Sequence, residues 1–432
     1  MAEVPAPDPR PADAGPADAA DSRAQVARIL PALIVGQVAM HSAMAGQRMA
    51  APLQALQLGY SAWAVGVLLA LFAALPVLIA LAAGRMADRH GYHRPIYLAV
   101  GLTMAGAALA LGACALTGAW QFAGLCLGAG VSGAGTNIGL IAIQRTAGQL
   151  VQDSTQRLRV FSWLGMAPSF ANVVGPVSAG FMIDAGGFAA AYALMLVLPI
   201  ASLVAARWVP VRGRQAPPAR AAGASSWDLL RAPGMQRLLF VNWLLSASWD
   251  VHSFAVPVLG HSRGYQASTI GLVLGSFTLA VTLVRFVVPM LAHRLNEITV
   301  LRTAMLLTGG VFMLYPFAAT AWLMGLCAGL LGLTLGAVQP MIMSTLHHLT
   351  PASRHGEAIA FRSMAINASS SVMPLAFGLA GSAVGPGVMF WAMGAAVGGG
   401  SWAARGLASV FAAEPASTAV LARPPGRSAD EA

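Results

Sequence analysis

Long apolar stretches, separated by short polar segments, recur from one end of this sequence to the other. A run of ~20 apolar residues can cross the hydrocarbon core of a bilayer as a helix. We therefore expect twelve spans, near residues 28–47, 63–83, 96–116, 120–144, 159–182, 188–208, 238–258, 268–292, 300–318, 321–344, 358–381 and 386–409. The pattern predicts an all-α, polytopic membrane protein.

The composition agrees with this prediction. Hydrophobic residues make up 57% of the 432 residues and charged residues only 9%, whereas a soluble domain carries about 25% charged residues. The net charge of +10 does not indicate nucleic-acid binding. The arginines lie between apolar spans, which is typical of charges that set the topology of a membrane protein. Cys114, Cys126 and Cys327 lie within apolar runs and lack metal-ligand spacing. We expect no metal, no cofactor and no disulfide.

The arginines predict an orientation. An even number of spans places both termini on one side, and the loops and tails of that side hold nearly all of the arginines, whereas the opposite side holds only Arg48 and Arg263. Cytoplasmic loops carry such an excess of positive charge. We expect a monomer in the lipid bilayer of the cell (inner) membrane, with both termini cytoplasmic.

The two halves of the sequence are related. Matches at fixed offsets of 205 and 198 residues pair Pro52 with Pro257, Gly66 with Gly271, Pro176 with Pro374, and Gly180 with Gly378. A parallel repeat of six spans places a site between the halves. The expected organisation is a disordered cytoplasmic tail at 1–27, a six-helix bundle at 28–208, a cytoplasmic middle loop at 209–235 with a short amphipathic helix at 225–230, a second six-helix bundle at 236–410, and a disordered cytoplasmic tail at 411–432.

A dense charge cluster lies in the loop expected between spans 2 and 3. It resembles the loop 2–3 signature of the major facilitator superfamily, G-x-L-x-D-R-x-G-R-[RK], at Gly84, Asp88, Arg89 and Gly91, although Tyr92 stands where the family prefers Arg. Together with the twelve spans, the long middle loop and the half-repeat, the resemblance covers about 28–410. It implies the major facilitator fold, with two pseudo-symmetric six-helix bundles, and secondary active transport.

This charge cluster is a candidate conformational latch. Asp88 could sit at the N-terminus of span 11, near Glu357, because a helix dipole favours an anion there. Arg362, about one turn further on, is a natural charge partner. The alternative is that these charges only set the membrane topology.

Span 5 carries a second resemblance. Gly175, Pro176 and Gly180 match the G-x-x-x-G-P-x-x-G-G signature of facilitator-type exporters, with Ala171 and Ala179 replacing two glycines. The resemblance implies efflux; the alternative is an ordinary small-residue packing face. In span 4 of such exporters a buried Arg precedes a glycine, and here that position is Val131. The usual drug–proton antiport mechanism is therefore in doubt.

Ionisable residues inside the membrane are costly and are functional candidates. Asp250, His41 and His252 are candidates for proton coupling, because burial favours the protonated form of a carboxylic acid. Two polar stripes at matching heights should face each other across a cavity: Asn242, Ser246, Asp250 and Ser253 in span 7, and Gln37, His41 and Arg48 in span 1. The alternative for Asp250 is an ion pair with Arg48.

Further polar and aromatic residues in the spans are candidates for the substrate cavity. Arg285 could bind an anionic substrate group or pair with a carboxylate, and Trp249 could stack on a substrate. The amides Asn137, Asn172, Gln339 and Asn367 are either cavity residues or interhelical contacts.

These features favour a transporter that exports an amphipathic small molecule by proton antiport. The alternative is a proton-coupled importer of a small organic anion. A membrane-embedded enzyme is not expected, since the sequence has no His-Glu-x-x-His motif and no supported catalytic cluster. It also has no nucleotide-binding loop.

Overall fold

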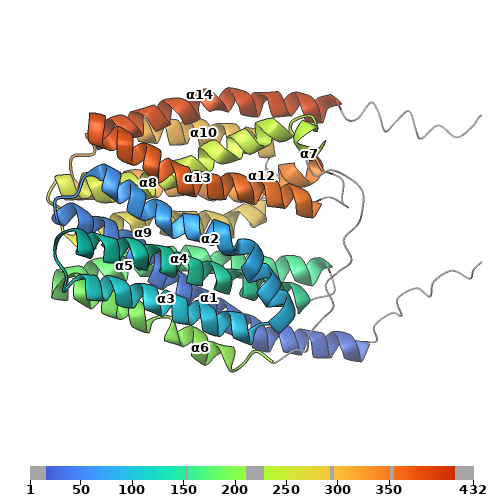
Figure 1. The fold of residues 1–432 in the computed structure, drawn as a ribbon. Coiled ribbons are helices and arrows are strands. Elements are labelled where there is room, and N and C mark those ends of the chain that lie inside the picture. Colours follow the sequence, from blue (N-terminus) through green and yellow to red (C-terminus); the bar gives the residue numbers. More distant parts are fainter. Residues whose placement is uncertain (1–15, 151–153, 211–227, 292–295, 351–354, 414–432) are drawn as a thin grey trace, which may run out of the picture.

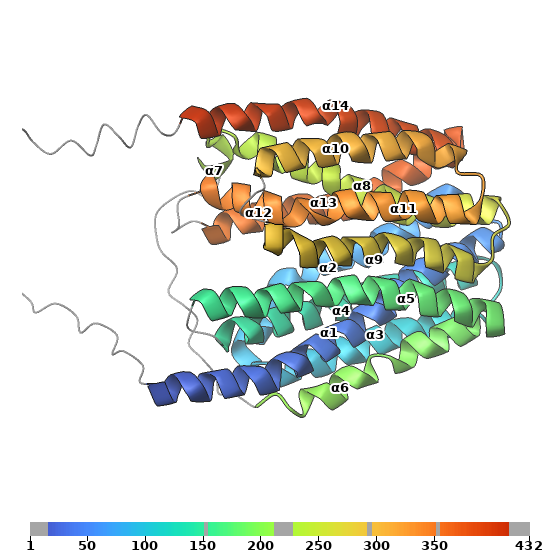
Figure 2. The same ribbon diagram turned by 180° about the vertical axis from the view of Figure 1, so that it is seen from behind.

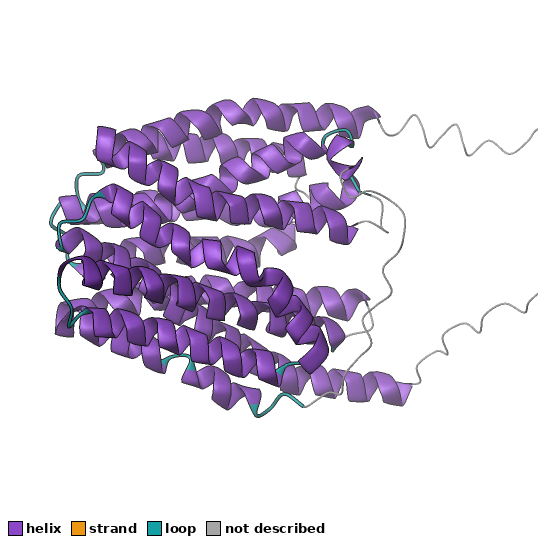
Figure 3. Ribbon diagram, in the orientation of Figure 1, coloured by secondary structure: helices purple, strands orange, loops and turns teal. Residues whose placement is uncertain are grey.

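The computed structural model describes residues 16–150, 154–210, 228–291, 296–350 and 355–413. Within these residues the chain is almost entirely helical and contains no strand (Figure 3). Internal hydrogen bonding of the backbone is what a bilayer demands of a spanning segment. The predicted all-α membrane fold is confirmed.

The helices run roughly side by side as a bundle (Figure 1). The first half contains α1 (Pro16–Gln57), α2 (Ala62–His90), α3 (His93–Ala113), α4 (Gly118–Gln149), α5 (Ser154–Val197) and α6 (Ile200–Ala206). The second contains α7 (Asp228–Arg231), α8 (Met235–Ser262), α9 (Ala267–Leu291), α10 (Glu297–Leu314), the 3-10 turn η2 (Tyr315–Phe317), α11 (Ala321–Gly336), α12 (Val338–His348), α13 (His355–Val384) and α14 (Pro386–Ala413).

All twelve predicted spans fall on helical segments. Helix α5 covers the fifth span and the first part of the sixth, and its two parts meet at Gly186 and Gly187, where the backbone is not helical. Helix α6 continues the sixth span. Gly187 has φ 75°, a backbone conformation that glycine adopts without a steric penalty. Nine stretches of the described chain are long and apolar enough to cross a membrane. Helix α8 is not among them, and it carries Asn242, Asp250 and His252.

Two predicted boundaries need correction. Helix α1 begins at Pro16, so residues 16–27 are helix rather than disordered tail; this segment is rich in alanine, the best helix former. Helix α14 likewise extends to Ala413, past the predicted end of its span. The remaining tail predictions lie outside the described residues, as does most of the expected amphipathic helix of the middle loop, of which α7 forms the end.

The predicted loop after span 2 also needs correction. Helix α2 continues through Gly84 to His90, and only Gly91, with φ 68°, ends it. The N–H of Gly91 donates to the carbonyl oxygen of Ala87, which is the glycine stop typical of helix C-termini. Gly84 does not break the helix because a single internal glycine costs only ~1 kcal/mol.

Helices pack mainly within each half. In the first half α1 packs on α5, and α4 packs on α2 and α3; in the second, α14 packs on α8 and α10, and α9 packs on α11. The halves meet along two helix pairs, α5 with α9 and α2 with α13. Helix α1 begins and α14 ends at the same end of the bundle (Figures 1 and 2). We call this end the terminal face and the opposite end the distal face.

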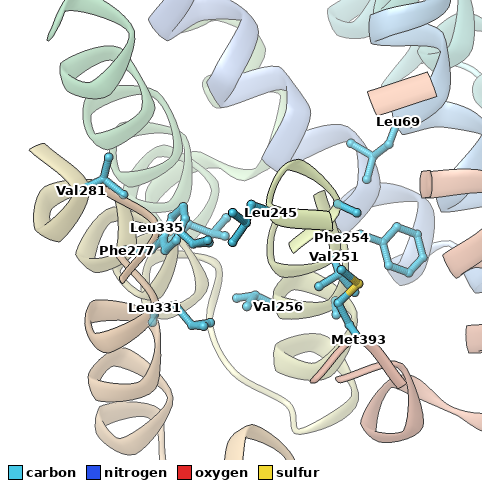
Figure 4. Packing of buried hydrophobic residues seen from close by; sticks show 14 of the residues in the cluster. Leu69, Leu245, Val251, Phe254, Val256, Phe277, Val281, Leu331, Leu335 and Met393 are labelled. Carbon is cyan, nitrogen blue, oxygen red and sulfur yellow. The ribbon is translucent and has the colours of Figure 1, made fainter. Parts of the chain in front are cut away.

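The core of the second half is apolar and centred on α8. Figure 4 shows Leu245 of α8 near Phe277 of α9 and Leu335 of α11, and Val251 of α8 near Met393 of α14 on the other side of the helix; all five are buried. Small residues allow other helices to approach closely, as is usual in membranes.

The halves touch at backbone level near the distal face. A Cβ on Gly271 would lie 2.5 Å from the Pro176 carbonyl oxygen, and one on Gly180 would lie 2.5 Å from that of Ala267. The second helix pair repeats the arrangement, with Gly66 against Pro374 and Gly378 against Ala62. We call these four contacts the distal seal. Residues that match at the two fixed sequence offsets therefore occupy equivalent places in the two pairs.

The close backbone contacts of the distal seal predict that one added methyl group lowers the stability of the protein. We expect Gly180→Ala to lower the free energy of unfolding by about 1–3 kcal/mol, because its Cβ would overpack the contact with α9. Gly165→Ala on the same helix is the control, since its Cβ would meet nothing within 4 Å. Thermal unfolding of both purified variants in detergent measures the difference. Equal melting temperatures would contradict the tight packing.

Candidate functional site

A cavity of about 260 Å³ lies between the halves. We call it the central cavity. Its lining comes from α1 and α5 on one side and from α8, α9, α11, α12 and α13 on the other, and the lining residues are His41, Arg48, Pro168, Ser169, Asn172, Asn242, Leu245, Ser246, Trp249, Asp250, Arg285, Leu335, Val338, Gln339, Ile366 and Ser370. The volume lies just below the ~300–1,000 Å³ of typical small-molecule pockets, which favours a small ligand.

The two stripes predicted in spans 1 and 7 contribute opposite walls of this cavity. Asn242, Ser246 and Asp250 line it from α8, and His41 and Arg48 line it from α1. Residues four apart on a helix share a face, so the spacing places each set along one wall.

Asp250 is held by two hydroxyl groups from another helix. Ser369 donates to its Oδ2 at 2.8 Å, and Ser370 donates to its Oδ1 at 3.2 Å. Both serines belong to α13, so the carboxylate joins α8 to α13 while facing the cavity. These bonds stabilise the ionised carboxylate, whereas burial opposes it.

The cavity is rich in positive charge. Of the lining residues that the structure describes, Asp250 is the only carboxylate, and it lies with two arginines from opposite halves, Arg48 and Arg285. Arg285 donates to the hydroxyl oxygen of Ser169 at 2.6 Å, across the interface between the halves. No carboxylate hydrogen-bonded to Arg285 is found among the residues that the structure describes.

One buried hydrogen-bond donor of the cavity has no partner among the described residues, and an arginine adds positive charge beside it. The donor is Nδ2 of Asn242. The arginine is Arg48 of α1, whose charge lies close enough to that of Asp250 for the two to attract each other. The ion pair considered from the sequence stays a hypothesis. Unsatisfied donors in a polar cavity favour a ligand that brings acceptor atoms.

His41 is anchored by an amide. Asn172 Nδ2 lies 3.4 Å from His41 Nε2 and 2.8 Å from the Pro168 carbonyl oxygen. The amide nitrogen can donate to the tautomer of His41 whose Nε2 carries no proton. Both residues line the cavity, as the sequence predicted for Asn172.

A second, smaller chamber continues the cavity toward the distal seal. It holds about 50 Å³ and shares Arg48, Asn172 and Trp249 with the central cavity. Its other lining residues are mostly apolar, and they include Pro176 of the seal: Ala45, Met49, Leu69, Pro176, Ser253, Leu274, Phe277 and Thr278. We call this chamber the deep lobe. The guanidinium of Arg48 is thus common to both spaces.

Several predicted cavity residues lie elsewhere. His252 is fully buried, its ring stacks on Phe277 at 4.4 Å, and its Nε2 lies 3.3 Å from the Tyr315 hydroxyl. Asn137 contacts the Pro76 carbonyl oxygen of α2 at 3.5 Å, so it acts as an interhelical contact. Gln37 is buried but does not line the cavity.

The remaining predicted residues of the second half divide between cavity and surface. Asn367 is exposed on α13 and is not a lining residue, although its neighbour Ile366 is. Gln339, by contrast, lines the cavity and accepts a hydrogen bond from Arg362. Trp249 lies at the junction with the deep lobe and packs edge-on against Phe277.

The described residues do not test the latch prediction. Arg362 is buried and bonded to Gln339 within the second half. The Asp88 and Glu357 side chains lie outside the described residues. Arg89 is exposed on the last turn of α2. The proposed pairing of Asp88 with α13 stays a prediction.

The span 5 motif packs in two directions. A Cβ on Gly175 would lie 2.5 Å from the Ser42 carbonyl oxygen of α1, so this glycine serves packing inside the first half. Pro176 and Gly180 contact α9 of the other half and form part of the distal seal. The motif therefore lies where the two halves would have to separate if the distal face opened.

Sequence reasoning missed an aspartate at this interface. Asp184 Oδ1 accepts from the backbone N–H of Ala267 at 3.0 Å, and its Oδ2 accepts from that of Ser268 at 2.9 Å. A carboxylate of α5 thereby caps the N-terminus of α9 in the other half, where the helix dipole favours an anion. Its position, four residues after Gly180 at the end of a span, was an available signal.

The serines that hold Asp250 were also missed. Ser369 and Ser370 belong to a run of three serines in an otherwise apolar span. Such a run is a polar signal at membrane depth, but its partner lies more than a hundred residues away in the chain. Ser169, which accepts from Arg285, was missed for the same reason.

Comparisons with known proteins agree with this architecture. The family model described as Major Facilitator Superfamily matches residues 33–239 and 238–427. The chain belongs to the Major Facilitator Superfamily. No sequence among the curated proteins matches it.

Solved transporter structures share the fold at low identity. A POT family transporter crystallised with a thioalcohol-conjugated peptide has a TM-score of 0.69 at 13% identity, covering 89% of this chain and 96% of its own. A POT family structure with 5-aminolevulinic acid has a TM-score of 0.69 at 12% identity, covering 90% and 96%. A bacterial homologue of ferroportin, in an inward-facing state, has a TM-score of 0.66 at 16% identity, covering 89% and 98%. At these identities the likeness concerns the fold alone.

The Asp184 cap predicts a change in access to the deep lobe. We expect Asp184→Ala to raise the labelling of a cysteine at Ser253, by an impermeant thiol reagent added at the distal face, roughly fivefold. Removing such a cap costs ~1 kcal/mol, which corresponds to about that factor. The experiment uses a background in which Cys114, Cys126 and Cys327 are replaced.

The matched control for this experiment is Ser382→Ala. Ser382 corresponds to Asp184 at the 198-residue offset, but its hydroxyl donates only to the Leu379 carbonyl oxygen of its own helix. Labelling should stay unchanged in that variant. Equal labelling in Asp184→Ala and the parent would show that the cap does not hold the distal face closed.

Proposed function

We propose that this membrane transporter carries a small amphipathic molecule with an anionic group, coupled to protons at Asp250. The observation that carries the proposal is the imbalance of the central cavity. Asn242 offers a donor that has no partner among the described residues, and Arg48 adds a positive charge, whereas the carboxylate of Asp250 is already bonded by two serines. A ligand that supplies acceptor oxygens complements these walls.

Proton coupling follows from the charge of the same cavity. When Asp250 is ionised, its negative charge offsets part of the field of Arg48 and Arg285. Protonation removes that charge and strengthens the attraction of the two guanidinium groups for an anion. Proton and anion therefore bind cooperatively, and their binding is linked as a coupling free energy. This linkage is that of symport.

Alternating access needs the distal seal to open. One arginine of the cavity comes from each half. A ligand bound by both arginines therefore contacts both halves, and its contacts change when one half rotates relative to the other. The Asp184 cap and the glycine contacts would hold the distal face closed in the state described. We infer from the distribution of arginines that the terminal face is cytoplasmic, and that the protein lies in the cell membrane as a monomer. The Asp88 latch would hold the terminal face in the opposite state.

Proton-driven export is the second candidate. It is favoured by the Gly175–Pro176–Gly180 motif, which resembles exporters and forms part of the distal seal. Antiport and symport differ in the direction of proton movement. The sign of the proton flux that accompanies substrate therefore separates them.

The test of proton coupling uses proteoliposomes with a pH dye inside. A panel of short-chain and aromatic carboxylates, with organic cations for comparison, is added outside. Under symport a transported carboxylate acidifies the lumen, whereas antiport makes the lumen alkaline. We expect Asp250→Asn to reduce this proton flux to the level of empty liposomes while exchange of the same carboxylate across the membrane continues. Proton flux that survives in Asp250→Asn would overturn coupling at Asp250.

The arginine of α1 is tested separately. We expect Arg48→Gln to weaken carboxylate binding by roughly tenfold to a hundredfold, because a charged hydrogen bond contributes ~1.5–3 kcal/mol. The change should appear in the KM of carboxylate exchange. Arg28→Gln is the control, since Arg28 is on the same helix but lines a surface groove against α6. Equal KM values for Arg48→Gln and the parent would contradict an anion site at Arg48.

A further inference from the structure

A groove on the outside of the second half is separate from the central cavity. It runs between α8 and α14, which pack side by side (Figures 1 and 2). It holds about 720 Å³, and its lining is almost entirely apolar apart from Gln236 and Arg237 at one end. We call it the α8–α14 groove.

Two glycines of α14 line the groove. A Cβ on Gly400 would lie 2.2 Å from Cδ1 of Leu244 on α8, so the Leu244 side chain occupies the space that this glycine leaves. A Cβ on Gly399 would meet nothing within 4 Å, so its missing side chain leaves open space. Aromatic walls stand on both sides, with Phe240 and Trp243 stacked 6.1 Å apart on α8 and the exposed Trp402 on α14. The result is a channel for an elongated apolar group.

Positive charge marks one end of the groove. Arg237 lies two residues after the start of α8, at the terminal face, and its Nη1 donates to the Gly406 carbonyl oxygen at 2.9 Å. This bond orients the guanidinium while the side chain stays exposed. Arg405 is also exposed and lies one turn beyond Trp402. Arg237 therefore lines the mouth, and a second exposed arginine lies on α14 at the same end.

The distance from the Arg237 guanidinium to the far end of the groove matches one leaflet. The lining on α14 runs from Ala395 to Ala403, and Arg237 is bound at Gly406, eleven residues from Ala395. At 1.5 Å per residue this is ~16 Å, about half of the ~30 Å hydrocarbon core. An acyl chain that enters at Arg237 would therefore end near the middle of the bilayer.

We propose that the α8–α14 groove binds one phospholipid of the terminal-face leaflet, and that it prefers an anionic headgroup. The acyl chain lies over Gly399 between the aromatic walls. The headgroup phosphate meets Arg237, because a guanidinium pairs well with phosphate oxygens. The second arginine adds attraction for a lipid with a net negative charge.

Native mass spectrometry of the purified full chain tests the proposal. Phosphatidylglycerol and phosphatidylcholine with identical acyl chains are titrated against the protein. We expect one retained phosphatidylglycerol, bound several-fold more tightly than phosphatidylcholine. Arg237→Gln should lower this preference about fivefold, since one surface arginine contributes on that order to anionic-lipid binding.

A groove-filling variant gives the decisive comparison. Gly399→Leu should lose the retained lipid, and Ala396→Leu serves as a second variant if the first does not fold. Gly310→Leu is the control, because Gly310 is exposed on α10 and a Cβ there would also meet nothing within 4 Å. Retention of phosphatidylglycerol in the filled variants, or equal binding of the two lipids by the parent, would overturn the proposal. A dimer that Gly399→Leu abolishes would assign the groove to a second copy of the chain.

Discussion

Close backbone contact between the halves at the distal seal determines the shape of everything inside this protein. Gly180 and Gly271 on one helix pair, and Gly66 and Gly378 on the other, bring the two bundles together where no side chain fits. Below this contact the helices diverge enough to leave the deep lobe and the central cavity. The pathway is closed at one end by van der Waals packing, which is the main force between helices in lipid.

The seal is pseudo-symmetric, but its polar reinforcement is not. Both helix pairs use glycine against a backbone carbonyl. Only the α5–α9 pair adds a carboxylate, because Asp184 caps α9; at the related position Ser382 bonds within its own helix. The contact between α5 and α9 is therefore stronger than the contact between α2 and α13. We expect the α2–α13 contact to separate more easily when the distal face opens.

The chemistry of the cavity is equally asymmetric. The first half contributes Arg48 and His41, and the second contributes Asp250 and its serines. Both halves carry an arginine of the cavity, Arg48 and Arg285, whereas the carboxylate that the structure describes there lies on the second half alone. Under the proposed coupling, protonation changes the charge of that half while the ligand interacts with both.

The all-α membrane fold, the relation between the halves and the place of Asp250 in the wall of a cavity could all be predicted from the sequence. The length of an apolar stretch and the spacing of its polar residues are local properties, and the thickness of the bilayer determines which stretches can cross it. The repeat even indicated which glycines and prolines occupy equivalent places. It could not show that Pro176 contacts Gly271 rather than its own repeat partner Pro374, since a fixed offset identifies equivalence and not contact.

Only the tertiary structure decided which polar groups share the cavity. His41 and His252 looked alike in sequence, yet one lines the cavity beside Asn172 and the other is buried against Phe277 and Tyr315. Asp250 accepts hydrogen bonds from Ser369 and Ser370, which lie more than a hundred residues away in the chain. The face that a helix presents depends on neighbours distant in the chain. Local sequence therefore determined what crosses the membrane, and packing between helices determined what meets inside it.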